Sequence, residues 1–243
     1  MFSSSLGKKY LMALTGFVLV GFVFVHMAGN LQILLGQRAI NAYAHALQSL
    51  PLPILWGSRL ILILSVVLHA WTAFLLIREN RRARPQKNEV EKTKKAGLSS
   101  LKMGLTGSIL MAFIVFHLLH FTIRTIYPEY EELRTLVGSP GDFEIHDVYS
   151  MVLAGFQNTW VSIFYVVGMF LLCGHLAHGV SSVFQSLGIM TVSWRGKLEV
   201  VAKAYAWIIF LGFSIVPLVV TGQKFGFFIF FDNTIFNAAL ALH

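Results

Sequence analysis

Charged residues are scarce in this chain of 243 residues, at 12% of the sequence, whereas soluble domains carry about 25%. Hydrophobic residues make up 56%, and the mean hydropathy is +0.69. This composition excludes a soluble enzyme, a nucleic-acid-binding module and a disordered tail. Cysteine is equally scarce: Cys173 is the only one, so the chain forms no internal disulfide and cannot hold an iron–sulfur cluster on its own cysteines. We therefore predict an integral membrane protein.

Long apolar segments recur five times, and each reaches the roughly 20 residues that a helix needs to cross the hydrocarbon core. The predicted helices cover approximately Tyr10–Leu35, Ile54–Ile77, Met103–Ile126, Trp160–Phe184 and Val200–Val220. The first is longer than the apolar region of a signal peptide and no cleavage site follows it, so we expect it to be retained. The predicted fold class is an all-α transmembrane bundle of five helices in a single membrane domain over residues 1–243, without a convincing internal repeat.

Basic residues lie mostly on one side of these helices. Of the 19 lysines and arginines, 14 precede the first helix or lie in the second-to-third and fourth-to-fifth connections, and an acidic stretch from Glu129 to Asp147 lies on the other side. The positive-inside rule therefore predicts a cytoplasmic N-terminus and an external C-terminus. Because the charges separate apolar blocks and form no patch, the net charge of +8 does not indicate a nucleic-acid partner.

Three further features concern the connections and the last helix. The segment Arg38–Ser49 has helical spacing and ends before Pro51, which predicts a helix along the membrane surface. The segment Ile126–Ser150 is rich in glycine and proline, which predicts a loop with a short helix. Pro217 is expected to kink the fifth helix.

Six of the nine histidines fall inside the predicted helices: His26, His69, His117, His120, His175 and His178. Ionisable residues inside a bilayer are costly and usually functional. At about 1.5 Å per residue, His26 and His117 lie about 25 Å and 22 Å beyond the cytoplasmic lysines that precede them. His69 and His175 lie only about 13 Å and 18 Å from the cytoplasmic ends of their helices. The four therefore form two layers, on the order of 10 Å apart.

Two opposed imidazoles at one depth suit a haem b with two axial histidines, and a four-helix bundle is a natural place for it. Glycines next to these histidines leave room for a flat macrocycle, although ordinary helix packing also explains them: Gly16, Gly21, Gly29, Gly104, Gly107, Gly168, Gly174 and Gly179. His120 and His178 follow candidate ligands by three residues, so each is an alternative ligand or a contact for a haem propionate or a quinone. A zinc site is less favoured, because zinc ligands cluster.

The chain resembles the cytochrome b558 family, the single-subunit, five-helix, two-haem membrane anchors of succinate dehydrogenases and fumarate reductases. The resemblance covers essentially the whole chain, and five motifs carry it: VHMAGNL around His26, NAYAHALQSLPL (Asn41–Leu52), LHAW around His69, FHLLHFTIR (Phe116–Arg124) and GHLAHGVSSVFQSLGI (Gly174–Ile189). It implies two haems b, with His26 and His117 as ligands of the distal haem and His69 and His175 as ligands of the proximal one.

The resemblance also implies partners and a location. A flavoprotein subunit and an iron–sulfur subunit would bind on the cytoplasmic side of the inner membrane. The chain would pass electrons between them and a membrane quinone, expected to be menaquinone, without carrying succinate chemistry itself. Candidate contacts for the quinone or for haem propionates on the outer side are Arg38, His45, Arg59 and Arg124. His146 is expected to be a surface histidine, and His243 a frayed terminal residue.

Two other functions remain open from the residues alone. One is a dihaem anchor of another respiratory enzyme, such as a hydrogenase or a formate dehydrogenase, although those anchors often place two ligands on one helix. The other is a haem-free transporter or assembly factor with structural histidines, which would favour carboxylates or broken helices inside the membrane.

Overall fold

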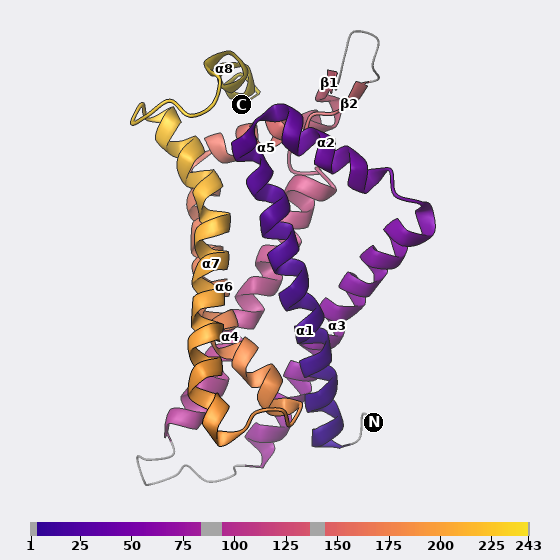
Figure 1. Ribbon diagram of the computed structural model, residues 1–243, viewed down its shortest axis with the longest axis vertical. Coiled ribbons are helices and arrows are strands. Elements are labelled where there is room, and N and C mark those ends of the chain that lie inside the picture. The colour runs from indigo at the N-terminus through magenta and orange to yellow at the C-terminus, as the bar shows by residue number, and fades with distance from the viewer. Residues whose placement is uncertain (1–3, 84–93, 137–143, 243) are drawn as a thin grey trace. The chain divides into compact units, whose positions relative to one another are not determined.

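The computed structural model describes residues 4–83, 94–136 and 144–242, with the side chains of residues 94–102 excepted. The described residues are 84% helical, and among them five helices are long and apolar enough to cross a membrane (Figure 1). The protein is therefore a predominantly α-helical, multi-pass membrane protein. Helices suit this environment because they satisfy every backbone hydrogen bond within one segment.

The five long helices coincide with the predicted ones and mostly extend past them. They are α1 (Ser5–Asn30), α3 (Leu52–Arg82), α4 (Lys94–His117), α6 (Thr159–Ser186) and α7 (Val192–Lys224). A 3₁₀ turn, η1 (Leu31–Leu35), follows α1, and a π-helical turn, η3 (Leu118–Thr122), follows α4. The predicted end of the third helix at Ile126 was wrong, because Arg124 adopts a left-handed backbone conformation with φ of 59°. Helix α7 continues through Pro217.

The connections hold more structure than the sequence predicted. Helix α2 (Gln37–Gln48) confirms the expected short helix. The glycine-rich segment contains η4 (Pro128–Glu132) and an antiparallel pair of strands, β1 (Arg134–Leu136) and β2 (Glu144–His146), with Thr135 opposite Ile145. This hairpin and the helices α5 (Val148–Gln157) and α8 (Asn233–Leu240) were not predicted. Each of these two helices begins at an aspartate whose carboxylate accepts hydrogen bonds from backbone N–H groups of the first turn.

Some predicted features lie outside the described residues. These are the basic residues Arg84, Lys87 and Lys92, the loop residues Gly138, Pro140, Gly141 and Asp142, and the terminal His243.

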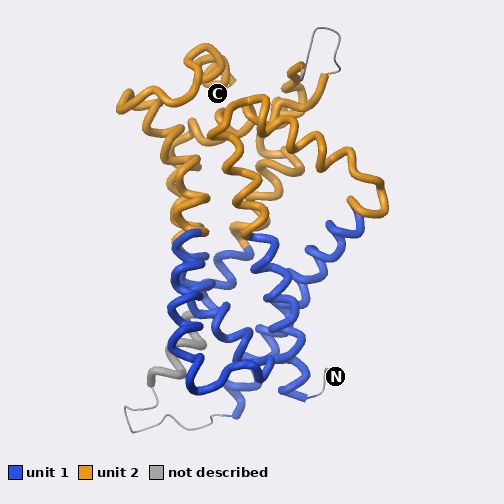
Figure 2. Tube along the Cα trace, viewed as in Figure 1, with its two compact units in different colours: residues 1–23, 56–111, 171–208 blue, residues 24–55, 112–170, 209–243 orange. Residues whose placement is uncertain are grey.

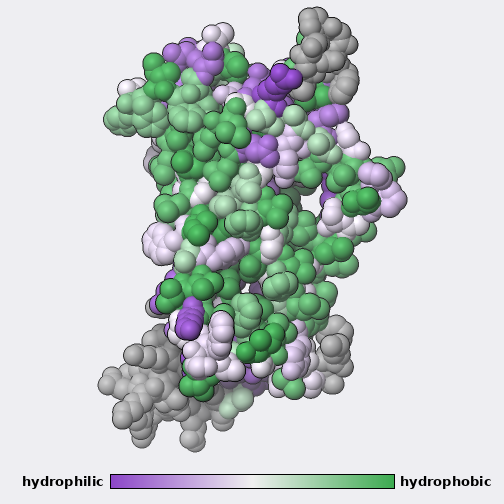
Figure 3. All heavy atoms as spheres, in the orientation of Figure 1, coloured by the Kyte–Doolittle hydropathy of each residue, from purple (hydrophilic) through white to green (hydrophobic). Residues whose placement is uncertain are grey.

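The chain divides into two compact units (Figure 2). Unit 1 comprises residues 1–23, 56–111 and 171–208, and unit 2 comprises residues 24–55, 112–170 and 209–243. Large apolar side chains remain exposed along the helices of both, including Phe17 of unit 1 and Leu211 of unit 2, and hydrophobic residues dominate the visible faces of the long helices in Figure 3. Apolar surface on this scale indicates contact with lipid.

Polar contacts reinforce each unit at the ends of its helices. In unit 1, the buried ammonium of Lys8 forms an ion pair with Glu79. In unit 2, the buried carboxylate of Asp147 accepts hydrogen bonds of 2.8 Å from both Gln37 and Asn41, which ties α2 to the start of α5. Asn41 is fully buried and in turn accepts a hydrogen bond of 3.0 Å from the N–H of Tyr149.

Candidate functional site

Unit 1 brings His69 of α3 and His175 of α6 together; we call them the inner pair. Their ring centroids lie 6.4 Å apart and their planes are inclined by 66°. Nδ1 of His69 lies 3.2 Å from the carbonyl oxygen of Met12 and 3.5 Å from the hydroxyl of Thr15. Nδ1 of His175 lies 3.3 Å from the hydroxyl of Thr106. In both histidines the δ nitrogen is thus engaged by protein, which directs Nε2 to any ligand.

Unit 2 brings His26 of α1 and His117 of α4 together; we call them the outer pair. Their ring centroids lie 5.8 Å apart and their planes are inclined by 78°. The amide of Asn30, one turn further along α1, lies 3.4–3.5 Å from the ring nitrogens of His26. The ring of Phe113 stacks on His117 at 6.1 Å and 11°. The pairing of these four histidines is the one that their depths in the helices predicted.

His120 occupies a different position from the outer pair. It is fully buried, its ring stacks on Phe121 at 3.9 Å, and its Nδ1 lies 3.0 Å from the phenol oxygen of Tyr165. The same phenol oxygen lies 3.4 Å from Nδ1 of His117. The π-helical turn η3 carries His120, and such turns are frequent at functional sites. The phenol oxygen of Tyr165 therefore contacts both histidines of the HLLH motif, so His120 is connected to His117 through Tyr165.

His178 is exposed and lines a polar cavity of about 340 Å³ in unit 1. The cavity lies between the end of α6 and the first turns of α7, and Ser181, Arg195 and Lys203 also line it. The hydroxyl of Ser181 donates a hydrogen bond of 3.0 Å to the carbonyl oxygen of His178. This side chain faces a polar surface and so suits an anionic or hydrogen-bonding group better than it suits an iron atom.

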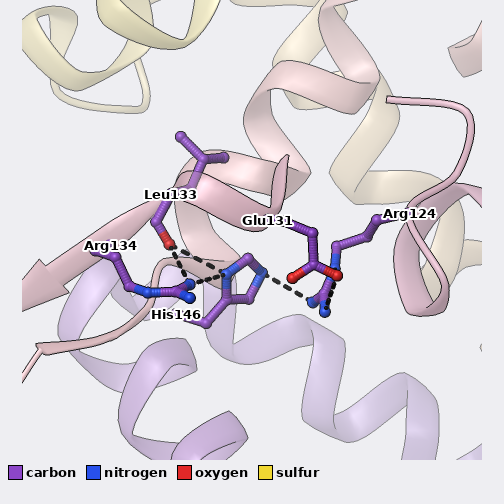
Figure 4. Close-up of polar contacts among 5 residues, drawn as sticks. All are labelled: Arg124, Glu131, Leu133, Arg134 and His146. Atoms are coloured by element: carbon purple, nitrogen blue, oxygen red, sulfur yellow. Dashed lines mark hydrogen bonds and ion pairs between the residues drawn. The ribbon is translucent and has the colours of Figure 1, made fainter. Parts of the chain in front are cut away.

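Arg124 and His146 belong to one cluster in the segment between α4 and α5 of unit 2 (Figure 4). The guanidinium of Arg124 forms an ion pair of 2.7 Å with Glu131 and lies 3.2 Å from Nε2 of His146. Nδ1 of His146 lies 3.1 Å from the carbonyl oxygen of Leu133. His146 was expected to be a surface histidine; it is partly buried and contacts Leu133, Arg124 and Arg134. Burial and then the charges of Arg124 and Arg134 hold the pKa of His146 below its ordinary value.

The remaining candidates are Arg38, Arg59 and His45. Arg38 is exposed, and the guanidinium of Arg59 lies over the ring of Trp56 at 5.0 Å. Nε2 of His45 lies 3.3 Å from the hydroxyl of Ser49, one turn along α2.

The separation of the rings in each histidine pair matches that of two imidazoles bound to one metal ion. A metal ion with nitrogen ligands at about 2 Å on opposite sides holds the two ring centroids about 6 Å apart, close to the separations of 5.8 Å and 6.4 Å. In each pair the two imidazoles come from different helices, so a metal ion between them would be bound from both sides. Within the described parts of the chain, no three histidine, cysteine or acidic side chains gather around a common point as a metal-ion site would require.

Sequence reasoning missed the two threonines beside the inner pair. The signal was a short repeat, Leu14-Thr15-Gly16 in α1 and Leu105-Thr106-Gly107 in α4, and in both helices a histidine of the outer pair follows the threonine by eleven residues. Eleven residues make slightly more than three helical turns, so the threonine and the following histidine lie on one face of the helix. Comparisons with protein-family models, with curated proteins and with solved structures find no match.

Proposed function

We propose that this protein is a dihaem cytochrome b that anchors a succinate:quinone oxidoreductase or a quinol:fumarate reductase in the inner membrane. The observation that carries the proposal is the presence of two separate histidine pairs, each made of imidazoles from two different membrane helices. His26 and His117 would hold the distal haem, and His69 and His175 the proximal one. Haem b supplies one-electron chemistry at such sites.

The chain's own residues account for the binding, the orientation and the insulation of these sites. Threonine hydroxyls and a carbonyl orient the inner imidazoles, and the rings of Phe113 and Tyr165 pack around His117. In a bilayer, the apolar helices would keep bulk water away from both pairs. The proposed partners are a flavoprotein subunit and an iron–sulfur subunit on the cytoplasmic side, with menaquinone in the membrane as the second electron partner.

A dithionite-reduced minus oxidised spectrum of the purified chain tests the haem assignment, with haem and protein both quantified. Two haems b per chain are expected. A folded chain without haem would contradict the proposal and favour a transporter or an assembly factor with structural histidines.

The partner assignment needs a separate test in native membranes. Succinate is expected to reduce the haems when the soluble subunits are present, and malonate is expected to block this reduction. Haems that respond instead to hydrogen or formate would identify the chain as an anchor of a different respiratory enzyme.

The proposed topology places the N-terminus in the cytoplasm and the C-terminus outside. Single cysteines at Ser4 and Leu242, introduced into a Cys173→Ser background, report on it through labelling of spheroplasts by a membrane-impermeant maleimide. Only the cysteine at position 242 is expected to react in intact spheroplasts, and both after lysis. The reverse pattern would contradict the orientation.

A further inference from the structure

The two histidines of the inner pair are held in the same way, each by a threonine of the preceding long helix. The hydroxyl of Thr15 lies 3.5 Å from Nδ1 of His69, and that of Thr106 lies 3.3 Å from Nδ1 of His175. Both hydroxyls donate their proton to a backbone carbonyl of their own helix, Thr15 at 2.8 Å and Thr106 at 3.2 Å. A hydroxyl has only one proton, so each oxygen is left as an acceptor for the imidazole.

The hydrogen bonds define which ring nitrogen carries the proton. The carbonyl oxygen of Met12, 3.2 Å from Nδ1 of His69, can only accept a hydrogen bond. Nδ1 of His69 is therefore the protonated nitrogen, and Nε2 carries the lone pair. The acceptor role of the Thr106 hydroxyl gives His175 the same tautomer. Both imidazoles of the inner pair thus present the nitrogen that a metal ion requires.

Glycines next to the threonines bring the rings within reach of the hydroxyls. A Cβ atom at Gly16 would lie 3.2 Å from Cε1 of His69, and one at Gly107 would lie 3.6 Å from Cε1 of His175. Each ring therefore rests on the backbone of the neighbouring helix, beside the threonine that precedes the glycine. In the Leu-Thr-Gly sequence the threonine contacts the imidazole and the glycine leaves room for its ring, and this sequence occurs twice in unit 1.

We propose that Thr15 and Thr106 are positioning residues that orient His69 and His175 toward a haem iron and increase the donor strength of their Nε2 atoms. This inference rests on the proposed function. A histidine ligand that donates its other N–H to an oxygen is a more basic ligand, and a more basic ligand favours the oxidised, more positive metal. Loss of the acceptor therefore makes the midpoint potential of the proximal haem more positive.

The two threonines are not equivalent. His69 retains the carbonyl of Met12 when the hydroxyl of Thr15 is removed, whereas Thr106 supplies the hydrogen bond that defines the tautomer of His175. Thr106→Val is therefore expected to have the larger effect and Thr15→Val the smaller one.

The test uses the full chain with Thr106→Val, Thr106→Ser and Thr15→Val. Thr72→Val is the matched control, because Thr72 is fully buried and its hydroxyl donates to backbone carbonyls of its own helix, among them that of His69, rather than to an imidazole. The readouts are a redox titration of both haems and the affinity of haem-depleted protein for added haem. Thr106→Val is expected to weaken one of the two haem sites by about 10-fold and to make the potential of that haem more positive, while the other haem is unchanged. Thr106→Ser restores both values.

Two results would overturn the assignment while leaving the proposed function intact. One is a wild-type chain with two haems in which Thr106→Val behaves like Thr72→Val. The other is a Thr106→Ser variant as impaired as Thr106→Val, which would indicate a packing role without a hydrogen bond. If Thr106→Val does not fold, Thr15→Val decides the question: a positive shift in the potential of one haem supports the assignment, and values equal to those of Thr72→Val overturn it. A folded wild-type chain that binds no haem would overturn the proposed function and this assignment together.

Discussion

Gly168 of α6 provides a sharp test of the packing around the outer pair. A Cβ atom at this position would lie 2.7 Å and 2.8 Å from two ring carbons of Phe113, far inside ordinary contact distance. Overpacking of this kind costs about 1–3 kcal/mol, whereas replacing a helical glycine by alanine contributes about 1 kcal/mol of stability. Gly168→Ala is therefore expected to lower the free energy of unfolding by at most about 2 kcal/mol.

The matched control is Gly57→Ala in α3, because no side chain or neighbouring backbone lies within 4 Å of a Cβ atom at Gly57. This variant is expected to gain the helix term alone, so the two variants should differ by about 1–3 kcal/mol. The assay is reversible unfolding of the purified protein in detergent. Because Phe113 stacks on His117, Gly168→Ala should also perturb the spectrum of one haem. Equal stability of the two variants would refute the packing argument, and restored stability in Gly168→Ala with Phe113→Leu would support it.

Three other predictions address the inner pair, the outer hairpin and the buried carboxylate. His69→Ala and His175→Ala should each lose one of two haems b by quantitative spectroscopy, and retention of both would assign the ligand role to a neighbouring histidine. The pKa of His146 lies below its ordinary value of 6.5 because of burial and nearby arginines such as Arg124, so its contribution to stability is complete above pH 6.5 and declines as the pH falls below that value. The protection factors of the amides in β1 and β2, which correct for the intrinsic exchange rate, should decrease there, and His146→Gln should abolish this dependence. Asp147→Ala should lower the free energy of unfolding by about 1.5–3 kcal/mol, because it removes an acceptor from several donors, and an unchanged denaturation midpoint would contradict that role.

The membrane helices could be predicted from the sequence because their signal is local. A run of about 20 apolar residues has few alternatives to a spanning helix, and the depth of each histidine follows from counting residues. The ends were harder: α3 continues to Arg82 and α7 begins at Val192, because charged residues extend a helix beyond the apolar run. The hairpin of β1 and β2 joins segments separated by a glycine-rich stretch, and its pairing carries no local signature.

The pairing of the histidines could be predicted, but their supports could not. Each support joins residues far apart in sequence, such as Thr15 with His69, and a threonine in an apolar helix has an ordinary explanation in bonding to its own backbone. Only the repeated Leu-Thr-Gly sequence distinguished Thr15 and Thr106 from other threonines. The position of His146 depended in the same way on Arg124 and Leu133, which approach it only in the folded chain.

The length of α7 has a consequence for how the chain matches its bilayer. At about 1.5 Å per residue its 33 residues extend about 50 Å, well beyond a hydrocarbon core of about 30 Å. The 20 residues between Lys203 and Lys224 contain no charged side chain and measure about 30 Å, so we expect these two lysines to lie at the boundaries of the hydrophobic layer. The preceding turns, with Arg195, Lys197 and Glu199, then project about 18 Å past that layer. A thinner bilayer would increase the tilt of α7, because tilting keeps the apolar residues between the two lysines inside the hydrocarbon.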